Sequence, residues 1–174
     1  IYFNSKLYCA NSPFEASQQG IVSVYQELNL FNNMTVAETL FIGSGNDDNG
    51  LIDWRNTYKD AGQLLNSIGL STINPHSVVG NLSVANQQLV ELTRALRQNP
   101  EVLLLDEPTA SLSEDEIKWL FRKIRDMASQ GKTVIYVSHH LDEVVELCNR
   151  CVILRDGKFA ATLEYEDFNP DNIV

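Results

Sequence analysis

Two apolar runs in this chain end in polar side chains whose types suit phosphate chemistry. Val102–Leu105 leads directly into Asp106 and Glu107, and Val134–Ser138 leads into His139. Short aliphatic runs of this kind are typical of buried strands in a parallel sheet, which present the residues after them at one edge. Phosphoryl-transfer enzymes place an acid at such a strand end to hold Mg2+. The pattern therefore predicts a phosphate and metal site at this edge.

Each polar residue suits one part of that chemistry. Asp106 suits a magnesium ligand, direct or through water, and Glu107 could act as general base toward a water molecule. His139 could hydrogen-bond a terminal phosphate, and Gln26, which also follows a predicted strand, could bridge a metal-bound water and a moving loop. Ser83 is expected to open a helix, and helix N-termini favour anions. Together these residues indicate hydrolysis of ATP.

The same residues also have structural interpretations. An apolar run that ends in two acids can be an ordinary strand, but the following Pro108–Ser111 and the second run favour the functional reading. Gln26 taken alone would be a surface glutamine, and Ser83 would be only a helix cap. We interpret His140 as a solvated neighbour of His139.

Composition narrows the classes of protein. The chain has 174 residues and a net charge of -10, so a nucleic-acid backbone is a poor partner. No apolar run approaches the roughly 20 residues that span a bilayer, and no signal peptide is recognisable. These features predict a soluble, intracellular protein that could bind a membrane partner.

The three cysteines, Cys9, Cys148 and Cys151, are an odd number, which argues against a disulfide framework. The Cys148-x-x-Cys151 spacing could be a redox pair or half of a zinc site, but no second Cys/His pair stands nearby. We interpret these thiols as buried or half-buried structural side chains.

Capping and turn signals predict the order of the elements. Helices are expected to begin after Ser12, Thr35, Asp53, Ser83 and Ser113, and another is expected over 141–147. Strands are expected over 21–25, 102–106, 133–138, 151–155 and 158–163, the last two joined by a hairpin turn at Asp156-Gly157. Residues 43–50 are polar and Gly-rich, which indicates a flexible loop.

Alternating strands and helices predict an α/β fold with a mostly parallel sheet. The middle of the chain is mostly helix and loop. We therefore expect a helical subdomain over 28–95 inserted into an α/β core formed by 1–27 and 96–174, with a C-terminal β-hairpin.

In addition, the chain resembles the ATP-binding subunits of ABC transporters, and more narrowly the first nucleotide-binding domain of the tandem ATPases of bacterial monosaccharide importers (ribose, galactose or xylose type). The resemblance covers nearly the whole chain. The matching segments, in order, are Ser12-Pro13-Phe14-Glu15-Ala16, Gly20-Ile21, Val24–Leu30, Met34–Glu38, Leu51–Trp54, Leu82-Ser83, Gln87-Gln88, Leu105–Ala110 and Ser138-His139.

The resemblance implies roles for the strand-end residues. Gln26 matches the Q-loop glutamine, which links magnesium and the attacking water to the membrane subunit. Asp106 matches the Walker B aspartate that holds Mg2+, Glu107 the catalytic base and His139 the switch histidine that senses the terminal phosphate.

Further matches concern nucleotide contacts. Ser111 lies in the segment that matches the D-loop. Ser83, Ala85 and Asn86 align with the signature motif, which binds the ATP held by an opposing domain. Val84 and Ala85 replace the glycines of that motif and Asn86 its usual glutamine, so its tip departs from the family pattern.

The family's Gly-rich Walker A loop does not occur among the 174 residues, and only 25 residues precede Gln26. The resemblance thus implies a partial P-loop NTPase core, from a truncated chain or an excised fragment. We expect the chain alone to bind ATP weakly or not at all, since the loop's lysine and N–H groups neutralise phosphates. Unpaired sheet edges could lead to a homodimer of the fragment.

In the intact protein, the resemblance implies an ATPase at the cytoplasmic face of the bacterial inner membrane, as a peripheral subunit. Its partners would be the transmembrane permease subunits, a second nucleotide-binding domain in head-to-tail contact and, indirectly, a periplasmic sugar-binding protein. Two alternatives stay open: a nucleotide-free interaction module that docks to a permease, and an ABC-type protein of translation or DNA repair. The acidity and the Gln26 segment argue against the latter.

Overall fold

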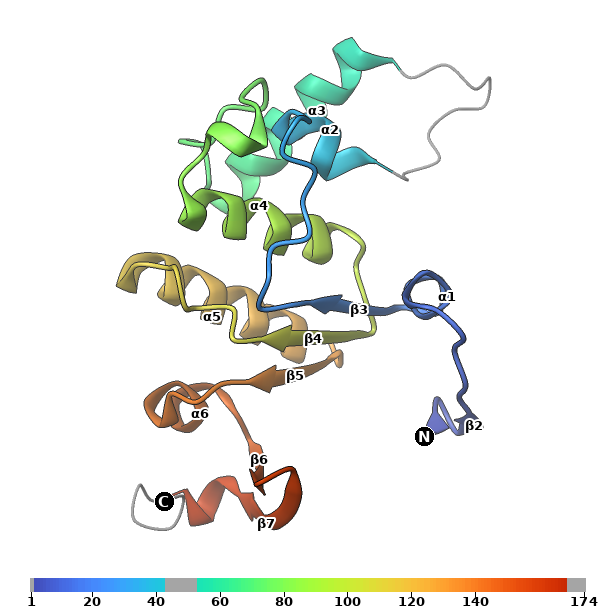
Figure 1. The fold of residues 1–174 in the computed structure, drawn as a ribbon, viewed down its shortest axis with the longest axis vertical. Coiled ribbons are helices and arrows are strands. Elements are labelled where there is room, and N and C mark those ends of the chain that lie inside the picture. Colours follow the sequence, from blue (N-terminus) through green and yellow to red (C-terminus); the bar gives the residue numbers. More distant parts are fainter. Residues whose placement is uncertain (1, 43–52, 169–174) are drawn as a thin grey trace.

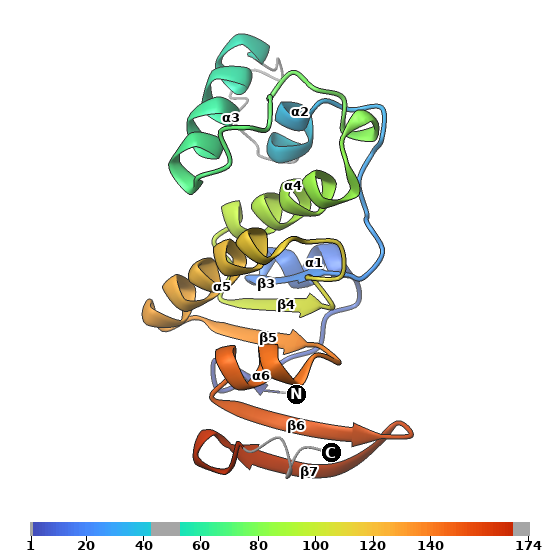
Figure 2. The same cartoon turned by 90° about the vertical axis from the view of Figure 1, so that its left-hand side faces the viewer.

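The computed structural model describes residues 2–42 and 53–168, so the loop expected over 43–50 lies outside the described residues. The described part has three layers along its long axis (Figures 1 and 2). One end is helical, the middle is a sheet with flanking helices, and the other end is a hairpin. The helical end contains α2 (Val36–Phe41) and α3 (Trp54–Ile68), and the hairpin is β6 (Arg150–Arg155) with β7 (Lys158–Glu164).

The central sheet has the order β3-β4-β5, and both pairings are parallel. The strands are β3 (Ile21–Val24), β4 (Val102–Asp106) and β5 (Thr133–Val137). Their register pairs Val24 with Leu105, and Asp106 with Val137. The carboxyl ends of all three strands therefore meet at one edge, as the α/β prediction requires.

Four helices flank this sheet: α1 (Pro13–Gln18), α4 (Val84–Arg97), α5 (Glu114–Ser129) and α6 (Leu141–Leu147). Their ends follow the capping residues in the sequence. The Ser12 side chain accepts from the N–H of Glu15, and Thr35 forms a full capping box with Glu38. Gly69 ends α3 in the left-handed region at φ 88°. The predicted helix starts are confirmed.

The core lies where α4 and α5 pack against the sheet and extends into the helical end. Leu103 and Leu105 of β4 are fully buried. The apolar faces of the helices cover them, with the remaining core contributed mainly by Val22, Val24, Val36, Leu40, Leu65, Leu89, Val90, Leu92, Leu120 and Ile124. Among residues 2–42 and 53–168, no helix is long and apolar enough to cross a membrane.

The sequence predicted one of the two β-hairpins and missed the other. At the C-terminal hairpin, Asp156 and Gly157 both have positive φ (51° and 71°), which matches a type I′ turn and confirms the prediction. The short N-terminal hairpin of β1 (Tyr2–Phe3) and β2 (Lys6–Leu7) was not predicted. Strands of two residues are too short to show an alternating pattern.

One hydrogen bond ties α5 to the end of α3. The indole Nε1 of Trp119, a side chain only 5% exposed, donates to the carbonyl oxygen of Ile68 at 2.6 Å. Ile68 is the last residue of α3, where carbonyl groups have no partner within the helix. Trp119 therefore satisfies a helix end as well as filling the core.

Replacing Trp119 by Phe removes the donor and leaves that carbonyl unsatisfied. We expect Trp119→Phe to lower the free energy of unfolding by about 1–3 kcal/mol, measured by urea denaturation. Trp54→Phe is the control, because Trp54 is the only other tryptophan, is exposed and makes no hydrogen bond through its side chain in the described structure. Equal effects of the two substitutions would contradict this account.

Candidate active site

The Glu107 carboxylate is held from two sides by residues that follow neighbouring strands. Gln26, after β3, donates from Nε2 to Oε2 of Glu107 at 3.1 Å. Nδ1 of His139, after β5, lies 2.9 Å from Oε1 of Glu107. Gln26 and Glu107 are 81 positions apart in the chain, and Glu107 and His139 are 32 positions apart. The fold brings all three residues together at the carboxyl edge of the sheet.

The backbone of Glu107 is in an unusual conformation. Its φ is 46°, which lies in the left-handed region. Residues other than Gly, Asn and Asp rarely adopt this region. Such a conformation costs about 1–3 kcal/mol and persists where the surroundings enforce it. Here the N–H of Glu107 donates to the carbonyl of Val137 at 2.9 Å, which continues the ladder between β4 and β5. The strained turn aims the carboxylate across the strand ends.

The position of the proton on the His139 ring determines which atom donates in its contact with Glu107. A neutral imidazole has one N–H and one acceptor nitrogen, whereas an imidazolium has two N–H donors. Nδ1 lies against Oε1 of Glu107, and we assign the ring proton to Nδ1 as the donor of this contact. The His139 side chain is 64% exposed and that of Glu107 is 26% exposed, so water reaches both groups. Nε2 remains available to a further partner.

Asp106 and Gln26 offer oxygen ligands for Mg2+. Asp106 is the last residue of β4, and no described residue donates a hydrogen bond to its carboxylate. The amide oxygen of Gln26 is likewise without a described partner. Within the described ranges, no three His, Cys, Asp or Glu side chains form a cage for a metal ion. Mg2+ typically takes only one or two protein oxygens and completes its shell with water and phosphate, so this donor set fits it.

The residues aligned with the signature motif lie at the start of α4. Ser83 accepts at Oγ from the backbone N–H of Asn86 at 3.2 Å, so its predicted capping role is confirmed. Ala85 and Asn86 belong to the same first turn, and Ser111 lies in the turn after β4. Within the described part of the chain, no hydrogen bond joins these four residues to Gln26, Glu107 or His139. Their contact with nucleotide stays a prediction.

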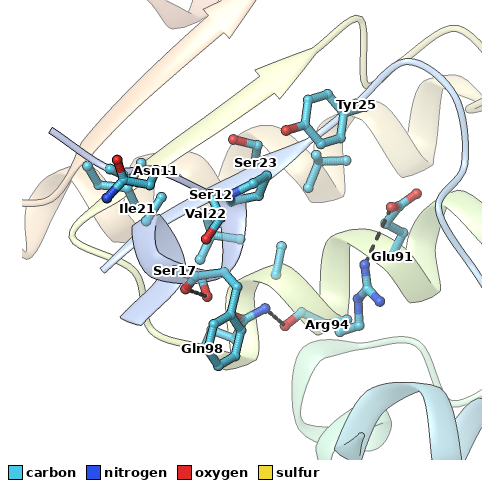
Figure 3. Close-up of a pocket in the computed structure, with 16 residues that line it drawn as sticks. Asn11, Ser12, Ser17, Ile21, Val22, Ser23, Tyr25, Glu91, Arg94 and Gln98 are labelled. Carbon is cyan, nitrogen blue, oxygen red and sulfur yellow. Dashed lines mark hydrogen bonds and ion pairs between the residues drawn. The ribbon is translucent and has the colours of Figure 1, made fainter. Parts of the chain in front are cut away.

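A separate cavity of about 590 Å³ lies beside β3, between α1 and α4 (Figure 3). None of Gln26, Asp106, Glu107 and His139 lines it. Glu91 and Arg94 of α4 do, and Figure 3 shows the ion pair between them. The cavity is therefore distinct from the strand-end site.

Glu91 was not singled out from the sequence, yet it links α4 to the segment after Gln26. It is 2% exposed, and its Oε1 accepts from the backbone N–H of Asn29 at 3.3 Å and lies 3.7 Å from Arg94. Burial raises the pKa of Glu91, against the lowering effects of that N–H and of Arg94. A charged residue within the apolar run Leu89–Leu92 was the available signal.

Two of the three cysteines fit the interpretation as buried or half-buried thiols, and Cys9 does not. Cys148 and Cys151 are half-buried and Cys9 is exposed, and all three are free thiols. Burial raises the pKa of Cys148, with a further contribution from Cys151, and burial also raises the pKa of Cys151. A raised pKa leaves less of the reactive thiolate at neutral pH.

We therefore expect iodoacetamide at neutral pH to label Cys9 first, and Cys148 and Cys151 more slowly. Peptide mass spectrometry over a time course measures the three rates, and urea-unfolded protein is the control in which the difference should shrink. Labelling of Cys148 or Cys151 ahead of Cys9 in the folded chain would show that this pair is activated.

Comparisons with known proteins agree with the geometry. The family described as ABC transporter matches residues 5–110. A ribose import ATP-binding protein of Rubrobacter xylanophilus is 39% identical over 174 residues, which is 100% of this chain and 35% of that protein. A xylose import ATP-binding protein of Geobacillus kaustophilus is 40% identical, again over 100% of this chain and 34% of that protein. The chain thus spans about a third of the length of these relatives.

Solved structures show the same fold. A nucleotide-free ATP-binding cassette from an ABC transporter superposes with a TM-score of 0.76 at 25% identity, over 99% of this chain and 71% of that one. A dimeric cassette bound to ADP and phosphate gives a TM-score of 0.78 at 23% identity, over 94% of this chain and 72% of that one.

Proposed function

The chain belongs to the ABC transporter family, and from this premise we propose that it forms part of an ATPase that powers a monosaccharide importer. The observation that carries the proposal is the Glu107 carboxylate, held between Gln26 and His139 beside the Asp106 strand end. The names of the relatives, which are ribose and xylose import ATP-binding proteins, support the sugar class.

Glu107 is the group that would accept a proton from the attacking water. Each of its two oxygens accepts one hydrogen bond, from Gln26 and from His139, and each can accept another, so a water molecule can join without breaking either contact. These bonds fix the direction of the carboxylate, which a general base needs. Nε2 of His139 has no described partner, and it can donate to a phosphate oxygen if the ring carries a second proton or changes tautomer.

Asp106 and the amide oxygen of Gln26 would hold the magnesium ion, which fits their chemistry. Bound there, Mg2+ would neutralise charge on the phosphates of ATP. The Glu107 carboxylate, held by Gln26 and His139, would orient the attacking water.

The decisive test is Glu107→Gln in the complete gene product that carries these residues. The amide keeps the shape of the side chain but cannot take a proton from water. We expect release of phosphate from MgATP to fall by about 100-fold or more, while binding of MgATP, followed by equilibrium dialysis, changes little.

The matched control is Glu114→Gln at the start of α5, whose side chain is 93% exposed and makes only a weak surface ion pair. It should leave both readouts unchanged. Phosphate release that survives Glu107→Gln would contradict the assignment of the base, and failure of the unaltered protein to hydrolyse ATP would contradict the function itself.

We also propose that residues 26–34 and the helical region that follows face a membrane permease. Phe31 supports this, because its large apolar ring is 60% exposed although it lies on an ordered turn, where the N–H of Met34 donates to its carbonyl. An exposed aromatic side chain on such a turn is a typical anchor for a partner protein. On this proposal residues 28–95 form the subdomain that transmits movement, and 1–27 with 96–174 form the ATPase core.

Phe31→Ser should therefore reduce the fraction of protein that sediments with membranes containing the permease, since it removes the aromatic anchor. Phe159→Ser on β7 is the control, because Phe159 is exposed but lies at the opposite end of the molecule. We expect ATP hydrolysis by the detergent-free protein to be the same in both variants. An equal loss of sedimentation in both would contradict this placement.

The start of α4 is proposed to contact ATP held by a second nucleotide-binding domain. Val84, Ala85 and Asn86 form the first turn there, and Val84 is exposed, which supports a contact outside the chain. The net charge of -10 again argues against nucleic acid as the partner.

A further inference from the structure

We infer that Glu143 is a positioning residue for His139, a role that rests on the proposed function because His139 acts there toward phosphate. Glu143 lies in the first turn of α6, four residues beyond His139, and forms no hydrogen bond with Glu107 or Gln26 in the described structure. It acts through the short segment that carries the histidine.

Three hydrogen bonds form this connection. Oε2 of Glu143 accepts from the Tyr136 hydroxyl at 2.7 Å and from the Ser138 hydroxyl at 2.8 Å. The Ser138 oxygen in turn accepts from the backbone N–H of His140 at 3.0 Å. One carboxylate oxygen thereby joins the end of β5 to the first turn of α6, on either side of His139.

The two ends of this connection determine where His139 can lie. Before it, Val137 is fixed in β5, opposite Asp106, and its carbonyl accepts from Glu107. After it, His140 is fixed by Ser138, and its ring lies 4.1 Å from the ring of His139, centroid to centroid. His139 therefore has little freedom along the backbone, and one face of its ring is covered by His140.

The two donors to Glu143 need one oxygen that can accept two hydrogen bonds. Burial and the hydrogen bond to Glu143 raise the pKa of Tyr136, so its hydroxyl keeps its proton and remains a donor. Two hydroxyl donors converge on a single oxygen. A carboxylate oxygen can accept both hydrogen bonds, whereas the alanine side chain has no acceptor. The bonds are partly buried, so water competes for them less than at the surface.

A simpler account is that Glu143 only stabilises the helix end, where acidic residues favour the dipole. Asp142 separates the two accounts, because it lies in the same first turn, is exposed and makes no side-chain hydrogen bond in the described structure. If the dipole were the whole role, Glu143→Ala and Asp142→Ala would have similar effects.

The test is side-chain nitrogen NMR of His139 in the 174-residue chain, which reports the protonated nitrogen without any nucleotide. In the unaltered chain we expect the Nδ1–H form, held by Glu107. Glu143→Ala should replace that signature by an average of the two tautomers. Asp142→Ala should keep it, and so should Glu143→Gln, whose amide oxygen can still accept both hydroxyls. An unchanged His139 signal in folded Glu143→Ala overturns the inference.

Circular dichroism establishes whether Glu143→Ala folds. Should it not fold, Ser138→Ala carries the test, because it breaks the link to His140 and keeps the bond between Tyr136 and Glu143; an unchanged His139 signal in that variant is equally decisive against the inference.

In the complete gene product, kcat for ATP should fall by about 100-fold in Glu143→Ala, the loss that a displacement of roughly 1 Å can cause, while KM for ATP holds. Rescue by Glu143→Gln should restore most of it. The NMR experiment measures the His139 ring without nucleotide and does not depend on hydrolysis. A negative NMR result would therefore overturn the role of Glu143 and leave the proposed function intact, and an absence of ATP hydrolysis would do the reverse.

Discussion

The structure depends above all on the parallel pairing of β4 with a strand on each side. This pairing buries Leu103 and Leu105 completely and brings the ends of three strands to one edge. It also supplies the carbonyl of Val137 that holds Glu107 at positive φ. That N–H to carbonyl bond helps to keep a glutamate in the left-handed region. Packing of the core and orientation of the carboxylate therefore share one cause.

Much of this arrangement could be predicted from local patterns. Helix ends marked by Ser12, Thr35, Asp53 and Ser83 lie where their side chains can cap the chain, because a cap is an interaction over three residues. The strand-end residues could be predicted too, since apolar runs in an α/β chain place their last residues at a common edge. The approach of Gln26 and His139 to opposite oxygens of Glu107 follows from strand order, which the sequence pattern alone leaves open.

The residues that escaped prediction make hydrogen bonds between distant elements. Trp119 of α5 donates to the carbonyl of Ile68, the last residue of α3, which is 51 positions away. Glu91 interrupts an apolar run of α4, and its partner, the N–H of Asn29, is 62 positions away. Glu143 looks like an ordinary helix-start acid until Tyr136 and Ser138 are seen to converge on it. Each pairing depends on tertiary geometry, for which the chain has no periodic signal.

The number of protons on the His139 ring links this geometry to the ATPase cycle that we propose. A neutral ring that donates from Nδ1 to Glu107 has no N–H left for phosphate. In the described structure, His139 is therefore hydrogen-bonded to Glu107 and cannot donate to a phosphate at the same time. A phosphate oxygen at Nε2 would need either a second proton on the ring or a change of tautomer that releases Glu107. The first route places an imidazolium between a carboxylate and a phosphate. The second frees Oε1 of Glu107 when water must be activated. In both routes the arrival of phosphate changes the surroundings of Glu107, the base that we propose. The proposed mechanism therefore requires that the position of His139 is fixed while its protons are free to move.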